Sequence, residues 1–139
     1  MLVEFQPLCA ARYSVSFFVK LKRLICKKLG IIDFLSYDYL WKKLLDYNET
    51  YNGKKLWRSC FVGFDNSPRK GKKSLIITGA SPSKFGKYLR SLIKNNDRNF
   101  DDNFLVVNAW NEWAEGAVLE PTEKDGFGYL EQIKAVSKN

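Results

Sequence analysis

The stretch that decides the fold is FLVVNAWNEWAEGAVLEP, residues 104–121. It begins with an apolar run, Phe104–Val107, of the kind that forms a buried strand. Asn108 and Asn111 follow, and asparagine favours turns because its side chain bonds to the nearby backbone. The pattern predicts a parallel-type strand that ends near Ala109 and runs into a polar turn.

This turn carries two tryptophans and two glutamates, Trp110, Glu112, Trp113 and Glu115. Carboxylates can act as acid, base or nucleophile at a glycosidic bond, and indole faces pack against the apolar faces of sugar rings. Residues three apart lie about 5–6 Å from each other in a helical turn, but roughly 10 Å apart in a strand. Glu112 and Glu115 therefore cooperate only if the strand has ended. The alternative is a solvated acidic pair flanked by structural tryptophans.

The motif WNEWAEG, followed by VLEPTEKDGFGYLEQI, resembles the endo-α-mannanase-like family of bacterial polysaccharide gene clusters, also called WbsX-type or glycoside hydrolase family ninety-nine-like. The segment CFVGFDNSPRKGK, Cys60–Lys72, is similar to the family's strand that ends in Asp-Asn-Thr/Ser, and LVEFQP at Leu2–Pro7 is weakly similar. The resemblance covers most of Leu56–Ala135.

The resemblance implies a (β/α)8 barrel that acts on glycosidic bonds, with Glu115 as general acid/base and Glu112 as its partner carboxylate. In the family's hydrolases the partner is thought to assist the sugar's own 2-hydroxyl. Those hydrolases tend to carry histidine where this chain has Ala114, and the polysaccharide-cluster branch has alanine. The substrate expected from the resemblance is an oligosaccharide or polysaccharide of capsule, O-antigen or lipopolysaccharide metabolism.

A complete barrel of this type needs about 250 residues, so 139 residues cannot hold one. We therefore expect an α/β chain that forms the C-terminal part of a (β/α)8 TIM-type barrel, as a single partial domain over 1–139. Residues 1–55 match the family poorly, and 56–139 are family-like. The periodicities predict alternating strands and helices: strands near Leu2–Phe5, Trp57–Phe64, Leu75–Thr78 and Phe104–Val107, and helices near Tyr37–Tyr47, Pro82–Lys94 and Gly126–Val136.

The N-terminal part is strongly basic, with six Lys or Arg and no acid between Glu4 and Asp33, in a chain of net charge +8. Apolar residues at helical spacing predict a basic amphipathic helix over Ser14–Leu29. Such a helix either lies on an anionic membrane surface or covers the barrel with a solvated lysine face. No nucleic-acid motif accompanies the charge, and no signal peptide or membrane span is visible, so we expect a cytoplasmic protein, membrane-peripheral if the helix docks.

The chain has no histidine, which excludes Ser-His-Asp and Cys-His catalysis and histidine metal sites. Phosphate-loop and dinucleotide fingerprints are also missing, so we expect neither a metal nor a cofactor. Cys9, Cys26 and Cys60 are odd in number and far apart, which favours reduced, partly buried thiols over a disulfide framework.

Further candidate substrate contacts lie in other segments. Asp65 ends an apolar run and either binds sugar hydroxyls or closes an Asx-turn, with Arg69 as its ion-pair partner or as a contact to an acidic sugar. Asn108 could orient either glutamate, and Tyr129 either packs the last helix or reaches the pocket. The full set of candidate substrate-binding residues is Asp65, Arg69, Asn108, Trp110, Asn111, Trp113, Glu120 and Tyr129.

The sequence thus predicts a glycosidase-like or glycosyl-transferring protein that uses a glutamate pair. The alternative is a truncated, non-catalytic remnant that binds carbohydrate or another chain. Because a partial barrel has an incomplete pocket, we expect the isolated chain to aggregate or to be inactive unless a partner chain supplies the missing half.

Overall fold

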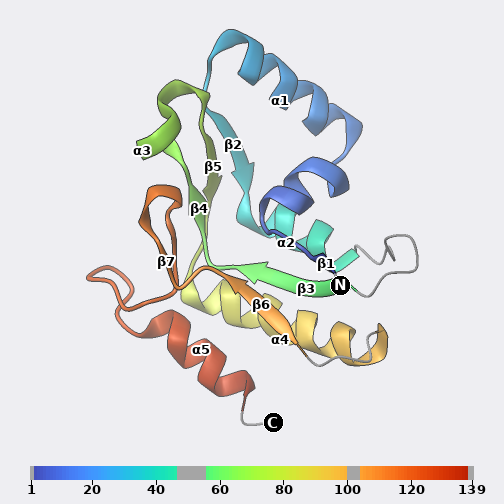
Figure 1. Cartoon of the computed structure of the whole chain (residues 1–139), viewed down its shortest axis with the longest axis vertical. Helices are drawn as coiled ribbons and strands as arrows, with labels where there is room; N and C mark the ends of the chain where they lie inside the picture. Colours follow the sequence, from blue (N-terminus) through green and yellow to red (C-terminus); the bar gives the residue numbers. More distant parts are fainter. Residues whose placement is uncertain (1, 47–55, 100–103, 138–139) are drawn as a thin grey trace.

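The computed structural model describes residues 2–46, 56–99 and 104–137, in which strands and helices alternate (Figure 1). The strands are β1 Leu2–Val3, β2 Asp33–Ser36, β3 Leu56–Phe61, β4 Phe64–Asp65, β5 Leu75–Thr78, β6 Leu105–Asn108, β7 Asn111–Glu112 and β8 Ala117–Val118. The helices are α1 Phe17–Leu29, α2 Tyr37–Asp46, α3 Ser67–Lys70, α4 Pro82–Asn99 and α5 Gly128–Val136, with short turns η1 Ala10–Ser14, η2 Gly71–Lys73 and η3 Trp113–Glu115.

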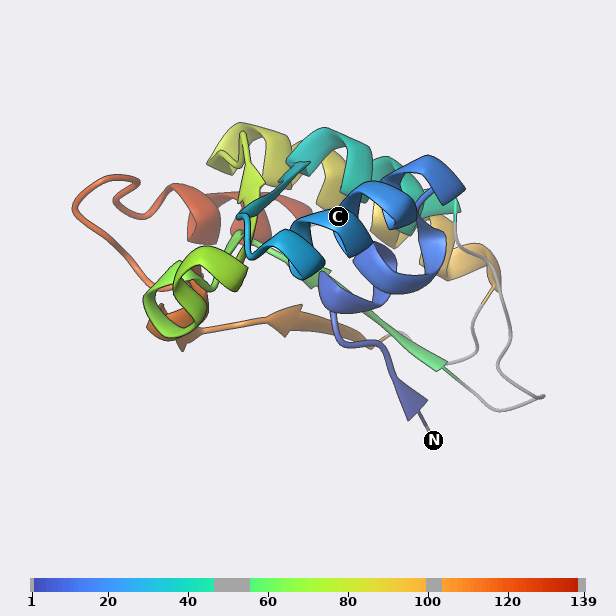
Figure 2. The same cartoon turned by 90° about the horizontal axis from the view of Figure 1, so that it is seen from above.

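Three parallel strands form the sheet that leads to the candidate site, in the order β1-β3-β6. A second sheet has the order β2-β5-β4, with β2 parallel and β4 antiparallel to β5, and β7 and β8 form a separate hairpin. Figure 2 shows α2 and α4 on one side of the β3–β6 ladder. Within the described ranges these sheets form no closed barrel.

The strand predicted over Trp57–Phe64 is two strands in the structure, which was not foreseen. β3 pairs with β6, whereas β4 crosses to the second sheet and pairs with β5. Gly63 lies at the break, where a Cβ atom would approach the carbonyl oxygen of Gly116 to 3.1 Å. The two chain segments therefore approach closely at the break, and an apolar run alone does not reveal this.

Strand β2 was not predicted, because its burial pattern reverses the usual one. Asp33 is buried and Phe34 is 50% exposed. The Asp33 carboxylate is held by ion pairs with Arg23 (2.7 Å) and Lys22 (3.3 Å) from α1. These partners lie some ten residues back along the chain, and they allow a charged side chain to take an inward position on the strand.

The other elements follow the predicted positions closely. α4 begins at Pro82, and the hydroxyl of Ser81 accepts the backbone N–H of Lys84 at 3.3 Å, as expected for an N-cap. The basic helix starts later than predicted, at Phe17, and ends at Gly30, whose φ of 65° suits a residue without a side chain.

An aromatic cluster joins α2 and α4 to β3. The ring of Trp41, which is fully buried, stacks on Phe61 (centroids 5.3 Å apart) and on Tyr88 (5.4 Å). Tyr37 meets Phe61 edge-on at 5.2 Å. Truncating a fully buried tryptophan of this kind typically costs about 3–5 kcal/mol, so this cluster holds the helices against the sheet.

A buried polar network ties β1 to β3. The carboxylate of Glu4 forms an ion pair with Arg58 (3.3 Å), and it accepts the backbone N–H of Ser59 (3.2 Å) and the side-chain amide of Gln6 (3.3 Å). Arg58 also donates to the carbonyl of Leu44, at the C-terminal end of α2. The network fixes the first strand at the edge of the sheet.

Candidate functional site

The glutamate-bearing turn follows directly from strand β6. β6 ends at Asn108, β7 holds Asn111 and Glu112, and η3 carries the chain from Trp113 to Glu115. Gly116 closes the turn in the left-handed region, with φ 57°. The strand therefore ends one residue before Ala109, which agrees with the prediction, although the turn is a 3-10 turn on a hairpin instead of an α-helical one.

The two glutamates of this turn have different surroundings. Glu115 is buried, with 7% of its surface exposed, whereas Glu112 lies on β7 with its side chain exposed. A guanidinium N–H of Arg69, from α3, donates to the Glu115 carboxylate. The Arg69 side chain is itself half exposed, so the pair lies at the boundary between core and solvent.

Asp65 lies against Gly116, the residue that closes the glutamate-bearing turn. Its carboxylate Oδ1 accepts the backbone N–H of Ser67 at 2.8 Å, which is the Asx-turn that the sequence allowed. A Cβ atom on Gly116 would lie 3.2 Å from both Cβ and N of Asp65. Of the two roles considered for Arg69, the ion pair is made with Glu115 and not with Asp65 in the described structure.

The tryptophans of the turn present their rings to solvent. Trp110 is 53% exposed and Trp113 is 60% exposed. The indole N–H of Trp113 donates to a carboxylate oxygen of Glu120 at 2.8 Å. The backbone after the hairpin lies next to Trp110, because the backbone N–H of Leu119 donates to the backbone carbonyl of Trp110 at 2.9 Å. Exposed indoles next to carboxylates suit contacts with sugar rings.

Two predicted contacts lie elsewhere. The side-chain amide of Asn108 donates to the carbonyl of Gln6 at 2.6 Å, so it links β6 to the N-terminal segment instead of to a glutamate. Tyr129 is buried and packs edge-on against Phe85 at 5.5 Å, which agrees with the packing role considered for it. Burial raises the pKa of Tyr129 to about 12, so its phenol is neutral near pH 7.

Sequence reasoning missed the polar residues that come from the N-terminal segment. Gln6 is 2% exposed; its amide oxygen accepts the backbone N–H of Ala10, and its carbonyl accepts Asn108. Its side-chain amide also donates to the carboxylate of Glu4, the ion-pair partner of Arg58 on β3. The signal available was the weak LVEFQP match, but nothing in one sequence links residues a hundred positions apart.

The cysteines and the other features of the described residues add little to the site. Burial raises the pKa of Cys60 to about 12, and all three cysteines are free. Among the described side chains no group of three or more His, Cys, Asp or Glu could hold a metal ion. No described helix is both long enough and apolar enough to cross a bilayer.

Comparison with known proteins gives a family match. Residues 6–133 match the family described as Glycosyltransferase WbsX, so the match extends N-terminally beyond Leu56–Ala135. Two relatives named Uncharacterized protein WxcX, from Xanthomonas campestris pv. campestris strains B100 and ATCC 33913, are each 39% identical over 74 residues. That is 52% of this chain but 11% of either relative, so the chain spans only a small part of their length. No solved structure matches the chain.

Proposed function

Because the chain belongs to the WbsX glycosyltransferase family, whose substrates are carbohydrates, we propose that it forms part of a protein that acts on a glycosidic bond of a bacterial surface polysaccharide. Glu112 and Glu115 are the proposed reactive carboxylates. The observation that carries the proposal is the turn at the end of β6, where a buried Glu115 lies three residues after an exposed Glu112, and the exposed Trp110 and Trp113 flank Glu112 along the chain.

In this proposal Glu115 donates a proton to the leaving glycosidic oxygen as the bond from that oxygen to the anomeric carbon breaks. An acceptor hydroxyl, from water or from another sugar, then adds to the anomeric carbon and returns a proton to Glu115. Glu112 acts on the sugar itself, assisting its 2-hydroxyl as the family resemblance implies. Trp110 and Trp113 supply stacking faces for the ring.

The Arg69 guanidinium sets a condition on this mechanism. A guanidinium pairs with the ionised carboxylate, whereas an acid must carry its proton when the leaving group departs. Arg69 therefore has to leave Glu115 when substrate binds, and its half-exposed side chain has room to do so. An acidic sugar would offer Arg69 another carboxylate to pair with.

We also propose that the chain is the C-terminal part of a (β/α)8 barrel whose other strands come from further polypeptide. Support comes from the parallel order β1-β3-β6 with helices between successive strands. In such a barrel the site lies at the C-terminal ends of the strands, and the β6 turn is at that end. We further place the protein in the cytoplasm, in contact with a membrane surface through α1.

A second candidate is a non-catalytic remnant that binds carbohydrate. The observation that favours it is that Arg69 already occupies the Glu115 carboxylate. The two candidates separate by measurement: a binding module changes its tryptophan fluorescence with oligosaccharide, loses that change in Trp110→Ala or Trp113→Ala, and shows no turnover.

The catalytic proposal is tested in a polypeptide that contains this chain and completes the sheet. We expect Glu115→Gln to lower the rate on substrates with poor leaving groups by about 10²–10⁴-fold, while retaining activity on activated aryl glycosides, which need little protonation. Glu112→Gln should fail on both substrates. Glu131→Gln, an exposed glutamate on α5, is the matched control.

A reversed pattern in the two variants would exchange the roles of the glutamates. If neither variant changed the rate while the protein was active, the β6 turn would not be the active site.

A further inference from the structure

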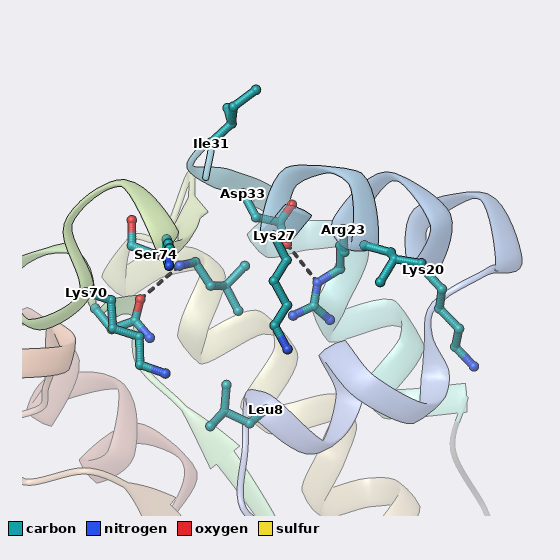
Figure 3. Close-up of a pocket in the computed structure, with 12 residues that line it drawn as sticks. Leu8, Lys20, Arg23, Lys27, Ile31, Asp33, Lys70 and Ser74 are labelled. Atoms are coloured by element: carbon teal, nitrogen blue, oxygen red, sulfur yellow. Dashed lines mark hydrogen bonds and ion pairs between the residues drawn. The ribbon is translucent and has the colours of Figure 1, made fainter. Parts of the chain in front are cut away.

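A concave site lies under α1, and its lining does not include the glutamates of the β6 turn. It is a cavity of about 520 Å³ between α1, strands β2 and β5, and the α3 segment (Figure 3). Five cations line it: Lys20, Arg23, Lys27, Lys70 and Lys73. Asp33 is the acidic residue of the lining, which leaves a net charge of +4 around one cavity.

The Asp33 charge is already used within the protein. Arg23 donates to Asp33 at 2.7 Å, and Lys22 pairs with the other carboxylate oxygen at 3.3 Å (Figure 3 shows the Arg23 pair). Each carboxylate oxygen of Asp33 therefore faces a cation, although the buried Oδ1 has no hydrogen-bond partner among the described residues, and the hydrogen bond to Oδ2 holds Arg23. Four lysines remain, from α1, α3 and η2, and within the described residues no carboxylate forms a salt bridge with them.

The cavity is built from a rigid frame. Asn66, which is 5% exposed, accepts the backbone N–H of Leu75 at 2.8 Å through its side chain, and this bond fixes the wall between α3 and β5. Ser74 next to it is 2% exposed, and its hydroxyl has no hydrogen-bond partner among the described residues. A hydroxyl can donate to an anionic oxygen. The wall thus provides a donor in addition to the lysines.

Part of the lining is aliphatic, from Leu8, Leu24, Ile31 and Leu75. We propose that this cavity binds a phosphate ester, with the phosphate among Lys27, Lys70, Lys73 and Ser74 and the esterified group against the aliphatic wall. Lysine acts as a point charge toward phosphate, and like charges gathered at one concave surface favour an anion there. The alternative of a merely solvated lysine face predicts no saturable binding.

The phosphate ester has two possible sources, a sugar phosphate and a lipid headgroup, and three probes distinguish them. They are inorganic phosphate, a hexose 1-phosphate and a short-chain soluble phosphatidic acid, each measured by equilibrium dialysis at low ionic strength against the polypeptide that contains this chain and completes the sheet. We expect saturable binding, with at least one ester bound more tightly than inorganic phosphate. The tighter ester identifies the source.

The test variant is Lys27→Gln with Lys73→Gln, which removes two charges from the cavity. We expect it to weaken binding of the preferred ester about tenfold, and added salt to weaken it further in the unmodified chain. The matched control is Lys94→Gln with Lys134→Gln, on α4 and α5 at the opposite end of the molecule from α1 (Figure 1), which should leave the affinity unchanged.

Circular dichroism checks that each variant is folded. Should the first pair fail to fold, Lys20→Gln with Lys70→Gln removes the same charge. Absence of saturable binding, equal weakening in the control, or inorganic phosphate binding as tightly as both esters would overturn the proposal. None of these outcomes depends on the glutamates of the β6 turn, so the proposal does not rest on the glycosidic function.

Discussion

Among the described residues three buried carboxylates are paired with arginine, Asp33 with Arg23, Glu4 with Arg58 and Glu115 with Arg69, and the last two arginines differ in exposure. The side chains of Glu4 and Arg58 are 1% and 4% exposed, whereas Arg69, the partner of Glu115, is 52% exposed. Breaking a fully buried pair by removing one partner typically costs about 3–5 kcal/mol, so the Glu4 pair is structural. The Glu115 pair is partly in contact with solvent, which the proposed role of Glu115 requires.

Gly116 is the residue on which the geometry of the turn depends most. It has φ 57°, where a side chain is strained, and an added Cβ would also lie 3.2 Å from Asp65. We expect Gly116→Ala to lower the free energy of unfolding by about 1–3 kcal/mol, measured by urea denaturation.

The control for this prediction is Gly30→Ala. Gly30 has a similar φ of 65°, but a Cβ there would meet nothing within 4 Å. It should show the backbone strain alone, so a loss as large as that of Gly116→Ala would mean that the contact with Asp65 is unimportant.

Among the helices and strands, the sequence predicted the ones that are specified by a local pattern of residues. β5 has the predicted bounds, and α2 and α4 begin where expected because apolar periodicity and the Ser81–Pro82 start are local signals. β2 and the break at Gly63 were missed because each depends on a distant partner, α1 for Asp33 and Gly116 for Gly63. For the same reason the Arg69–Glu115 pair could not be predicted.

Helix α1 has no buried residue, although it is strongly amphipathic in sequence. Its apolar face, defined as Phe17, Phe18, Leu21, Leu24, Ile25 and Leu29, is exposed, with Phe18 at 80%. Lysines occur along the same helix, and lysine is depleted at the cores of protein interfaces but common on helices that lie on membranes. This charge pattern favours an anionic bilayer over a protein as the surface that covers the face.

We therefore expect the chain to float with vesicles that contain anionic lipid, and to bind neutral vesicles more weakly. Leu21→Ser with Ile25→Ser should abolish most of the flotation. Substitution of Phe127, an exposed apolar residue next to α5, by serine should leave the flotation unchanged. Equal flotation of all variants would favour the alternative that α1 covers a barrel.

In the molecule as a whole, the β1-β3-β6 sheet has two edge strands, and neither pairs with a further strand in the described structure. β1 and β6 are its outer strands, and the side chains of β6 are only partly buried. Unpaired edges of this kind recruit other strands.

We expect the isolated chain to self-associate in sedimentation experiments and to lack glycosidic turnover, whereas co-production with polypeptide that supplies the neighbouring strands should give a discrete species. A monomeric, catalytically active 139-residue protein would contradict this expectation.

The parallel order β1-β3-β6 also governs how the chain reaches its native state. Each ladder joins segments about fifty residues apart, Leu2 with Leu56 and Arg58 with Leu105. The chain must lose the entropy of closing these long loops before the contacts between the strands can offset that loss. On the ribosome, β3 acquires its second neighbour only after β6, about fifty residues further along the chain, has emerged. Until then one edge of β3 remains unpaired, so the nascent chain is a natural client for chaperones, and its yield should depend on the speed of synthesis.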